Sequence, residues 1–236
     1  MIKDYIVVDV ETTGLNPVTD QIIEISAIKV LDGKTVETYE QLIHPGISIE
    51  SPIVELVGIT DEMVKDAPGM SEVIGEFLEF TEELPIMGHN LLFDYSFLKT
   101  AAVRYGKTFG KAGVDTLAIA RKYLTELESR RLDALCSYFG ISDENHHRAL
   151  NDAMAAGELY RVLCEKFYLE GENDKDFAPI PLQFSVKKVS PATAKQLSYL
   201  KSLMERYGIE EPVQMEQLTK SQASKMIDHI LFQYGR

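Results

Sequence analysis

The sequence predicts an α/β protein, a mixed β-sheet flanked by helices, with a small helical module at the C-terminal end of its 236 residues. Strand-like segments come first and then alternate with helical ones, an order typical of helices packed on a sheet. The turn sequence Asp32-Gly33 joins two early strands as a hairpin, which makes part of the sheet antiparallel. A long amphipathic helix near residue 150 supplies a face that must pack on such a sheet.

The strands are predicted from runs of β-branched and apolar residues. Residues 5–10 are typical of a buried strand, because Ile and Val side chains pack well on a pleated surface. Residues 21–30 form the second predicted strand and residues 35–43 the third. The third strand carries Glu37 and Glu40, so we expect it at the edge of the sheet.

The helices are predicted from apolar residues that recur at spacings of three and four. The clearest helix covers residues 148–167, where Ala149, Ala153, Ala156 and Tyr160 mark one face. Because the first half of this face is made of small residues, we expect the helix to lie close to the sheet. Short strands are also expected over 85–87 and at 114, and further helices over 71–83, 91–105, 116–124 and 132–139.

The chain is predicted to divide into a main domain, residues 1–169, a linker, residues 170–183, and a small helical module, residues 184–236. The linker is acidic and contains prolines, a composition typical of loops. In the module, Thr219 and Gln222 form a capping box at the start of the last helix. Basic residues outnumber acidic ones in the module, whereas the whole chain has a net charge of −13, so we expect the two units to have different roles.

Composition excludes several classes of protein. Hydrophobic residues make up 45% of the chain and charged residues 26%, the values of a globular protein. No apolar run approaches the roughly 20 residues of a membrane helix, and no signal-peptide pattern opens the chain, so we expect a cytoplasmic protein with no membrane contact. Cys136 and Cys164 are too far apart for a zinc ribbon and are expected to be buried thiols. The acidic net charge argues against a non-specific nucleic-acid coat protein.

Asp9 and Glu11 are the first candidate site residues. Side chains two positions apart on a strand share a face, so these carboxylates lie side by side at the end of an apolar strand. Their repulsion favours protonation of one of them unless a cation is present, and divalent cations prefer carboxylate oxygens. Considered alone, the pair fits a metal site and a solvated strand end equally well.

Two further motifs place acidic residues at helix starts. Asn90 is expected to cap a helix with Asp94 in its first turn, although the helix dipole alone favours an acid there. His147 and Asp152 would not share a face of one helix, so they converge only if His147 precedes the helix, and His146 is an alternative. Together, four carboxylates and a loop histidine match two-metal phosphodiester hydrolysis, in which a histidine takes the proton of the attacking water.

The three motifs resemble those of the DEDDh exonuclease family, in the same order: Asp9-x-Glu11-Thr-x-Gly14, His89-Asn90-x-x-Phe93-Asp94 and His147-x-Ala149-x-x-Asp152. The resemblance covers residues 4–168 and is strongest to the proofreading exonucleases of bacterial DNA polymerase III, the epsilon subunit and the exonuclease domain of the PolC type. It implies an RNase H-like fold and removal of nucleotides from 3′ ends.

The resemblance also implies a role for each residue. Two divalent metal ions, Mg²⁺ or Mn²⁺, would be held by four catalytic carboxylates, Asp9, Glu11, Asp94 and Asp152. His147 would be the general base. Residues similar to those that bind substrate are Thr12, Thr13, Leu15, His89, Asn90 and Phe93. For Leu15 and Phe93 a place in the core is the alternative, and Asp115 is expected to cap the next helix rather than to bind metal.

The predicted function is a two-metal-dependent 3′–5′ exonuclease, a hydrolase that degrades DNA from the 3′ end to nucleoside 5′-monophosphates in proofreading or repair. The predicted partners are DNA with a single-stranded or frayed 3′ end and, through the C-terminal module, a DNA polymerase or repair complex. One alternative is an exoribonuclease that trims RNA 3′ ends, since this chemistry does not need deoxyribose. The other is a nucleic-acid-binding scaffold on an inactive nuclease fold, which the complete set of catalytic side chains disfavours.

Overall fold

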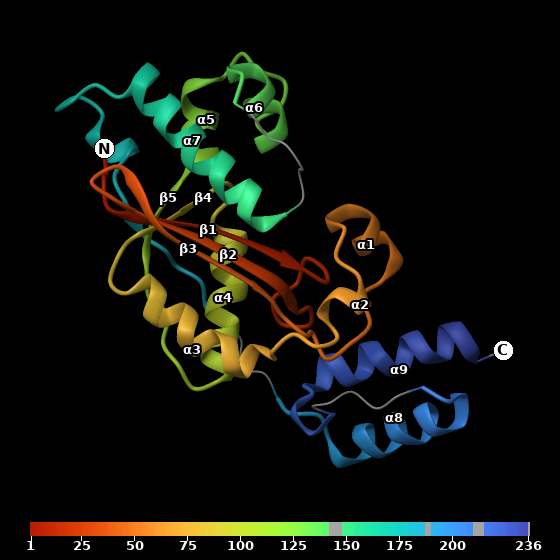
Figure 1. The fold of residues 1–236 in the computed structure, drawn as a ribbon. Coiled ribbons are helices and arrows are strands. Elements are labelled where there is room, and N and C mark those ends of the chain that lie inside the picture. Colours follow the sequence, from red (N-terminus) through yellow and green to blue (C-terminus); the bar gives the residue numbers. More distant parts are fainter. Residues whose placement is uncertain (142–147, 187–189, 210–214, 236) are drawn as a thin grey trace.

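A six-stranded mixed sheet in the order β3-β2-β1-β4-β5-β6 forms the centre of the computed structural model, which describes residues 1–141, 148–186, 190–209 and 215–235 (Figure 1). The strands are β1 (Tyr5–Thr12), β2 (Ile22–Leu31), β3 (Lys34–Leu42), β4 (Ile86–Gly88), β5 (Ala112–Asp115) and β6 (Ile180–Pro181). β1 pairs antiparallel with β2 and parallel with β4, and β5 pairs parallel with β4 and antiparallel with β6. The predicted mixed sheet is therefore confirmed, and β1 lies inside it.

β2 and β3 form the predicted hairpin. Asp32 has φ 48° and Gly33 has φ 73°, as a two-residue turn that matches the twist of the strands requires. β3 is the outermost strand on this side of the sheet, and most of its side chains are exposed, including Glu37. The edge position predicted for this strand is confirmed.

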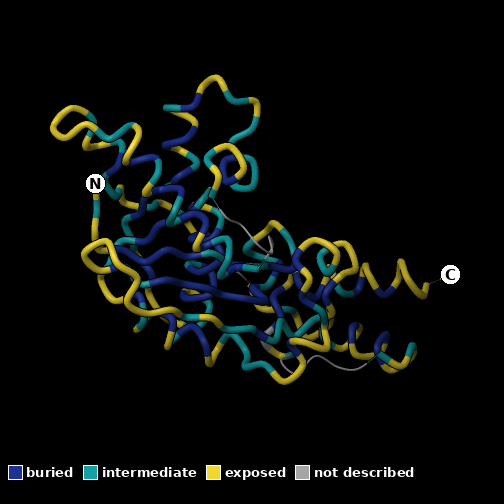
Figure 2. Tube along the Cα trace, turned by 45° about the horizontal axis from the view of Figure 1, so that its top comes forward, coloured by how far each residue is buried: buried dark blue, intermediate teal, exposed yellow. Residues whose placement is uncertain are grey.

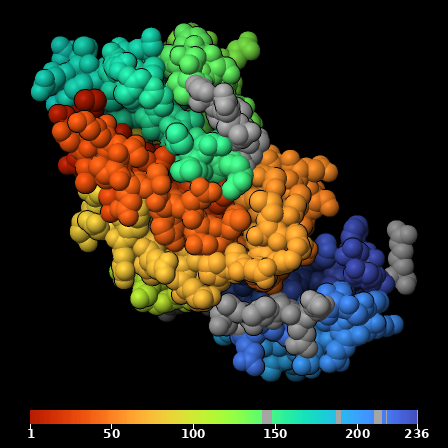
Figure 3. Space-filling view, viewed as in Figure 1, coloured from red at the N-terminus to blue at the C-terminus, as the bar shows by residue number. Residues whose placement is uncertain are grey.

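Helices cover both faces of the sheet (Figures 1 and 2). α3 (Met70–Thr81) and α4 (Leu92–Arg104) pack on the face to which Ile6, Val8 and Val10 point. α5 (Thr116–Tyr123), α6 (Leu132–Phe139) and α7 (Ala149–Phe167) pack on the face of Tyr5 and Val7. The remaining α-helices are α1 (Ser51–Val57), α2 (Asp61–Val64), α8 (Ala194–Tyr207) and α9 (Lys220–Tyr234), of which the last two form a separate lobe, blue in Figure 3.

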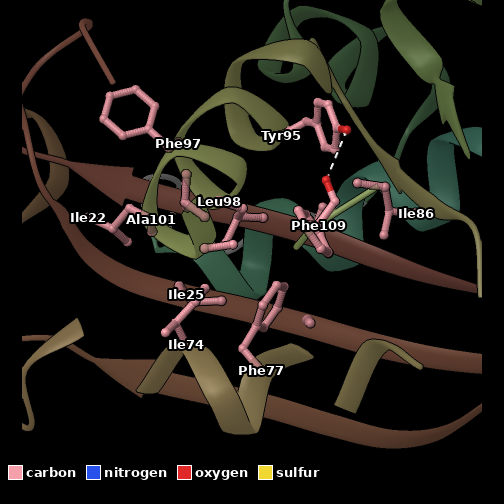
Figure 4. Packing of buried hydrophobic residues seen from close by; sticks show 14 of the residues in the cluster. Ile22, Ile25, Ile74, Phe77, Ile86, Tyr95, Phe97, Leu98, Ala101 and Phe109 are labelled. Carbon is pink, nitrogen blue, oxygen red and sulfur yellow. Dashed lines mark hydrogen bonds between the residues drawn. The ribbon is translucent and has the colours of Figure 1, made fainter. Parts of the chain in front are cut away.

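Large side chains fill the core beneath α3 and α4 (Figure 4). The rings of Phe77 and Phe109 lie 6.1 Å apart, and those of Tyr95 and Phe109 lie 5.6 Å apart. The buried Tyr95 hydroxyl donates a hydrogen bond of 3.2 Å to the Phe109 carbonyl. Because a buried hydroxyl without a partner is costly, this bond lets a tyrosine stand among apolar residues.

α7 approaches the opposite face closely, as its small residues predict. Ala153 and Ala156 are buried against this face. A Cβ atom at Gly157 would lie 3.3 Å from the Val7 side chain, so only a residue with little side chain fits there without adjustment. This close approach brings the start of α7 to the end of β1.

The structure differs from the predicted linker over residues 170–183. Phe177 is fully buried, and β6 extends the sheet by pairing with β5. Leu182 and Phe184 also pack against the core beneath α3 and α4. The apolar residues interspersed among the acidic ones supply enough burial to fix this segment on the main domain. The connection to the module therefore begins after Phe184.

The C-terminal module has a core of its own, in which Leu200 and Leu203 of α8 pack with Ile227 and Ile230 of α9. The predicted capping box of α9 is present. The Thr219 hydroxyl accepts a hydrogen bond from the Gln222 N–H at 3.1 Å, and the Gln222 side chain accepts one from the Thr219 N–H at 3.0 Å. Across the described residues, no helix combines the length and the apolar character needed to cross a membrane. Both cysteines are buried, as predicted.

Candidate active site

A cluster of carboxylates lies where β1 meets the first turn of α7. Asp9 and Glu11 share the face of β1 that α7 covers, and Asp152 comes from the first turn of α7. One oxygen of each of these carboxylates lies within 4.8 Å of the others. Three of the four predicted ligands are thus brought together. Their oxygens are the donor type that Mg²⁺ and Mn²⁺ prefer, so the residues fit a divalent metal ion.

The fourth carboxylate, Asp94, reaches β1 from α4 on the opposite face of the sheet. Its side chain is 3% exposed, and its Oδ1 accepts a hydrogen bond of 3.1 Å from the Val10 N–H. Its charge is the largest electrostatic contribution, after burial, to the raised pKa of Asp9. Asp94 therefore lies beside the group of three rather than within it. Its role at a second metal ion stays a prediction.

The turn before α4 differs from the prediction. The N-cap position is Leu91 rather than Asn90, and no side chain caps the helix. Asn90 has φ 65°, a conformation that asparagine tolerates better than most residues, and its N–H donates to Asp115 at 2.9 Å. Asp115 also accepts a hydrogen bond of 2.9 Å from the Leu117 N–H. Asp115 is thus the cap of α5, as predicted.

The carboxylates of the cluster resist ionisation. Burial, followed by the charges of Asp94 and Glu11, raises the pKa of Asp9 well above its usual range. Burial, with Asp152 as the next cause, raises the pKa of Glu11 to about 8. Burial also raises the pKa of Asp94 to about 8. Neighbouring acids held out of water in this way are stabilised by a cation, which favours a metal site over a solvated strand end.

Glu24 and Arg148 form a charged pair beside the cluster that the sequence reasoning missed. Glu24 lies opposite Glu11 in the β1–β2 ladder and is fully buried. Its carboxylate accepts hydrogen bonds from Arg148 Nη2 at 2.8 Å and from the Ala149 N–H at 3.1 Å. Glu24 thereby fixes the start of α7 over β1. The signal in the sequence is an acid near the start of a strand made mostly of apolar residues.

The predicted substrate residues Thr12, Thr13 and Leu15 lie at the end of β1 and in the loop that follows. The Thr12 hydroxyl donates to the Gly14 carbonyl at 2.6 Å, and the Thr13 hydroxyl accepts from the Gln21 N–H at 2.9 Å. Both hydroxyl groups therefore shape the loop. Leu15 is 84% exposed, so the alternative that places it in the core is wrong.

His89 is held by the protein through both ring nitrogens. Nδ1 lies 2.9 Å from the Thr116 hydroxyl, and Nε2 lies 2.9 Å from the Arg130 carbonyl. Burial lowers the pKa of His89, which favours the neutral ring. The structure therefore gives His89 a bracing role between β4, α5 and the segment before α6, and its contact with substrate stays a prediction.

Phe93 and Asn90 lie in different environments, one partly in the core and the other at a cavity. Phe93 is half-buried, with its ring 5.0 Å from that of Phe97, so part of this side chain belongs to the core. Asn90 is exposed and lines, together with Asp152, a cavity of about 490 Å³.

Three arginines in the same cavity wall were not predicted as site residues: Arg121, Arg130 and Arg131. Arg130 donates its hydrogen bonds to the carbonyls of Leu124 and Thr125, and Arg131 pairs with Asp133. The exposed Arg121 adds positive charge beside the carboxylate cluster, which suits a phosphate-bearing ligand.

The predicted general base His147, and His146 as its alternative, lie outside the described residues. α7 begins at Ala149, and Arg148 ahead of it is extended, with φ −126° and ψ 122°. The helix thus starts late enough to meet the condition derived from the sequence, that a histidine acting beside Asp152 must precede the helix. The choice of base stays a prediction.

Known proteins match both parts of the chain. Residues 6–160 match the RNase_T family, described as an exonuclease, and residues 190–236 match a protein of unknown function (DUF3072). The DNA polymerase III PolC-type of Caldanaerobacter subterraneus subsp. tengcongensis is 41% identical over 163 residues, which are 69% of this chain and 12% of the relative. That of Thermotoga maritima is 40% identical over 162 residues, or 68% of this chain and 12% of the relative. The chain therefore spans a small part of these relatives.

Solved structures share the fold. Exonuclease X in complex with duplex DNA that has a 5′ overhang aligns with a TM-score of 0.59 and 25% identity, over 73% of this chain and 98% of that one. E. coli exonuclease I in complex with a dT13 oligonucleotide aligns with a TM-score of 0.61 and 18% identity, over 69% and 41%. The predicted RNase H-like fold is confirmed. Because the family match runs from β1 into α7 and includes the whole carboxylate cluster, the chain belongs to the exonuclease family.

Proposed function

We propose that this protein is a metal-dependent 3′–5′ exonuclease that degrades DNA from the 3′ end and releases nucleoside 5′-monophosphates. The observation that carries the proposal is the convergence of Asp9, Glu11 and Asp152 within 4.8 Å, with Asp94 beside them. Two divalent ions, Mg²⁺ or Mn²⁺, would suit such a cluster, because these ions prefer carboxylate oxygens. The similarity to DNA polymerase III PolC-type and to a DNA-bound exonuclease supports DNA as the substrate.

The proposed mechanism divides the work between the metal ions and the chain. When bound, the ions supply charge stabilisation to the attacking and leaving oxygens of the phosphodiester. Asp9, Glu11, Asp94 and Asp152 would hold the ions, and His147 would take the proton from the attacking water. Glu24 keeps α7 in register with β1, so that Asp152 stays within reach of Asp9.

The substrate is held by groups around the cluster. The loop of Thr12, Thr13 and Leu15, together with Phe93, is proposed to hold the terminal nucleotide, because Leu15 offers an exposed apolar side chain to a base. The cavity next to Asp152 offers the exposed Arg121 side chain to phosphate groups.

We propose a role in proofreading or repair in the cytoplasm, with the C-terminal module binding a DNA polymerase or repair complex. The PolC-type relatives support a link to replication. The basic character of the module, against an acidic main domain, supports a separate binding role for it.

The test is digestion of 5′-labelled oligonucleotides by the purified full chain in Mg²⁺ or Mn²⁺, with and without a chelator. The substrates are single-stranded DNA, duplex DNA with a paired or a mismatched 3′ end, and RNA of the same sequence. We expect a ladder that shortens from the 3′ end, mononucleotide products, and loss of cleavage with the chelator. Faster cleavage of RNA would assign the protein to RNA trimming, and binding without cleavage in either metal would make it a scaffold.

A further inference from the structure

One buried carboxylate, Asp20, organises the loop between β1 and β2. Its Oδ2 accepts a hydrogen bond of 2.9 Å from the Asn16 N–H, and its Oδ1 accepts one of 3.1 Å from the Thr19 hydroxyl. Asp20 is 7% exposed and packs so closely on Gly14 that a Cβ atom there would lie 2.3 Å from Oδ2. The shape of the loop that carries Leu15 therefore depends on the position of this carboxylate.

The cation that pairs with Asp20 comes from the C-terminal module. Lys225 Nζ of α9 lies 2.8 Å from Asp20 Oδ1, and among the described residues it is the cation in ion-pair contact with Asp20. Burial opposes ionisation of Asp20, but hydrogen bonds from Lys225 and from the Asn16 N–H outweigh it, so the pKa of Asp20 is lowered. The nearby Arg104 donates its hydrogen bonds elsewhere, to Gln21 and to the backbone of the loop.

The ion pair is part of a wider contact between the module and the main domain. Leu218 and Gln222 of the module line a cavity of about 260 Å³ together with Gln21 and Arg104. Figures 1 and 3 show the C-terminal helices against the main domain on the side toward which β1 runs. The module thus contacts the flank of the loop, while Leu15 stays 84% exposed.

We propose that the C-terminal module acts on the active site through Lys225, which pairs with Asp20 and so positions the loop of Leu15 for the 3′-terminal nucleotide. The proposal rests on the proposed exonuclease function. Lys225 is a positioning residue, since it acts through Asp20 and lies outside the carboxylate cluster. Without Lys225 the buried carboxylate loses its cation, and the loop populates other conformations. The apparent affinity for the nucleotide falls in proportion to the fraction of molecules that keep the competent loop.

A lysine in a basic module is also able to contact the DNA backbone directly, and substrate length separates the two roles. The p-nitrophenyl ester of thymidine 5′-monophosphate contains a single nucleotide, so contacts to the rest of a strand do not contribute to its binding. If Lys225 positions the loop, its removal raises KM for the ester and for an oligonucleotide alike. If Lys225 contacts the DNA backbone instead, its removal raises KM for the oligonucleotide alone.

The experiment compares Lys225→Ala, Lys225→Arg and Lys220→Ala in the full chain. Lys225→Ala should raise KM by about fivefold or more for both single-stranded DNA and the ester, with kcat within about twofold of the wild type. Lys225→Arg should restore KM, because it keeps the charge. Lys220→Ala removes the same charge from the first turn of the same helix, where the side chain is exposed, and should leave KM for the ester unchanged.

Hydrogen exchange gives a readout that does not depend on activity. In Lys225→Ala the amides of residues 14–20 should exchange faster, while those in the middle of β1 keep their protection. A rise of KM for the oligonucleotide alone, or unchanged exchange with unchanged KM, would overturn the proposal. If the wild-type chain lacks nuclease activity but exchange responds as expected, the proposed function fails while the coupling between module and loop stands.

Discussion

Glu11→Gln should stabilise the metal-free protein, by an amount that grows with pH. Burial, followed by the charge of Asp152, raises the pKa of Glu11 from 4.5 to about 8. Because the folded-state pKa lies above the unfolded one, the folded state retains a proton that the unfolded state releases, and stability is lost as pH rises from 4.5 toward 8. At about 1.4 kcal/mol per pH unit, the loss at pH 7 is about 3 kcal/mol. Glutamine has nearly the same shape as glutamate but does not ionise, so the Glu11→Gln protein does not lose this stability as the pH rises.

Thermal unfolding of the wild type and of Glu11→Gln in a chelator, from pH 5 to pH 8, measures this difference in stability. For a chain of this size about 3 kcal/mol corresponds to a rise in Tm of roughly 6–12 °C at pH 7. The rise should be smallest at pH 5, close to the unfolded-state pKa of 4.5, because only below that value are both states protonated. With saturating Mg²⁺ or Mn²⁺ the wild type gains stability from binding, so the difference should narrow or reverse.

Glu24→Gln is the matched control, since Glu24 lies opposite Glu11 in the sheet and is fully buried. Its charge is paired with Arg148, so the same chemical change should lower the stability of the metal-free protein, by about 1–3 kcal/mol. Equal gains in stability from the two variants would mean that the removal of one negative charge from an acidic protein explains the effect by itself. A Glu11→Gln protein no more stable than the wild type at pH 8 in chelator would refute the electrostatic reasoning.

Three further predictions concern catalysis and domain structure. Asp9→Asn should nearly abolish DNA hydrolysis in Mg²⁺ without loss of fold by circular dichroism, and hydrolysis at the wild-type rate would show that the metal assignment is wrong. His147→Ala should slow hydrolysis by roughly 10²–10⁴-fold, less so at high pH, whereas His146→Ala should do much less; equal defects would contradict the choice of base. A chain ending at Val186, which keeps the packed Phe184, should stay folded and cleave saturating DNA, with weaker DNA affinity at low salt; an inactive or unfolded product would make the module part of the catalytic fold.

The parts of the fold that were predictable from sequence depend on local patterns. The hairpin follows from Asp32-Gly33 because a turn with two positive φ angles needs such residues. α7 follows from its stripe of small and apolar residues. The segment 170–183 was mispredicted because β6 is fixed by its partner β5, far away in the chain, and two residues carry no periodicity of their own. Asn90 was mispredicted because its positive φ places it before the helix, in a turn whose N–H is bound by Asp115 of a distant segment.

The candidate site was predictable to the extent that its residues stand at the ends of elements. Asp9, Glu11 and Asp152 occupy a strand end and a helix start, and the order of elements brings these together. Glu24 was missed because its partner, Arg148, approaches only once α7 crosses the sheet. Pairings of this kind depend on tertiary placement, which neither periodicity nor motif spacing encodes.

Ion pairing distinguishes Asp94 from the other two buried acids of the described residues. Three acidic side chains among the described residues are less than 9% exposed: Asp20, Glu24 and Asp94. Asp20 is paired with Lys225 and Glu24 with Arg148, and each fixes a segment that borders the site. Asp94 has no ion pair within the described part of the chain, and its pKa is raised to about 8. A buried acid without a cation destabilises the fold, so its presence beside Asp9 is best explained by a ligand that carries positive charge.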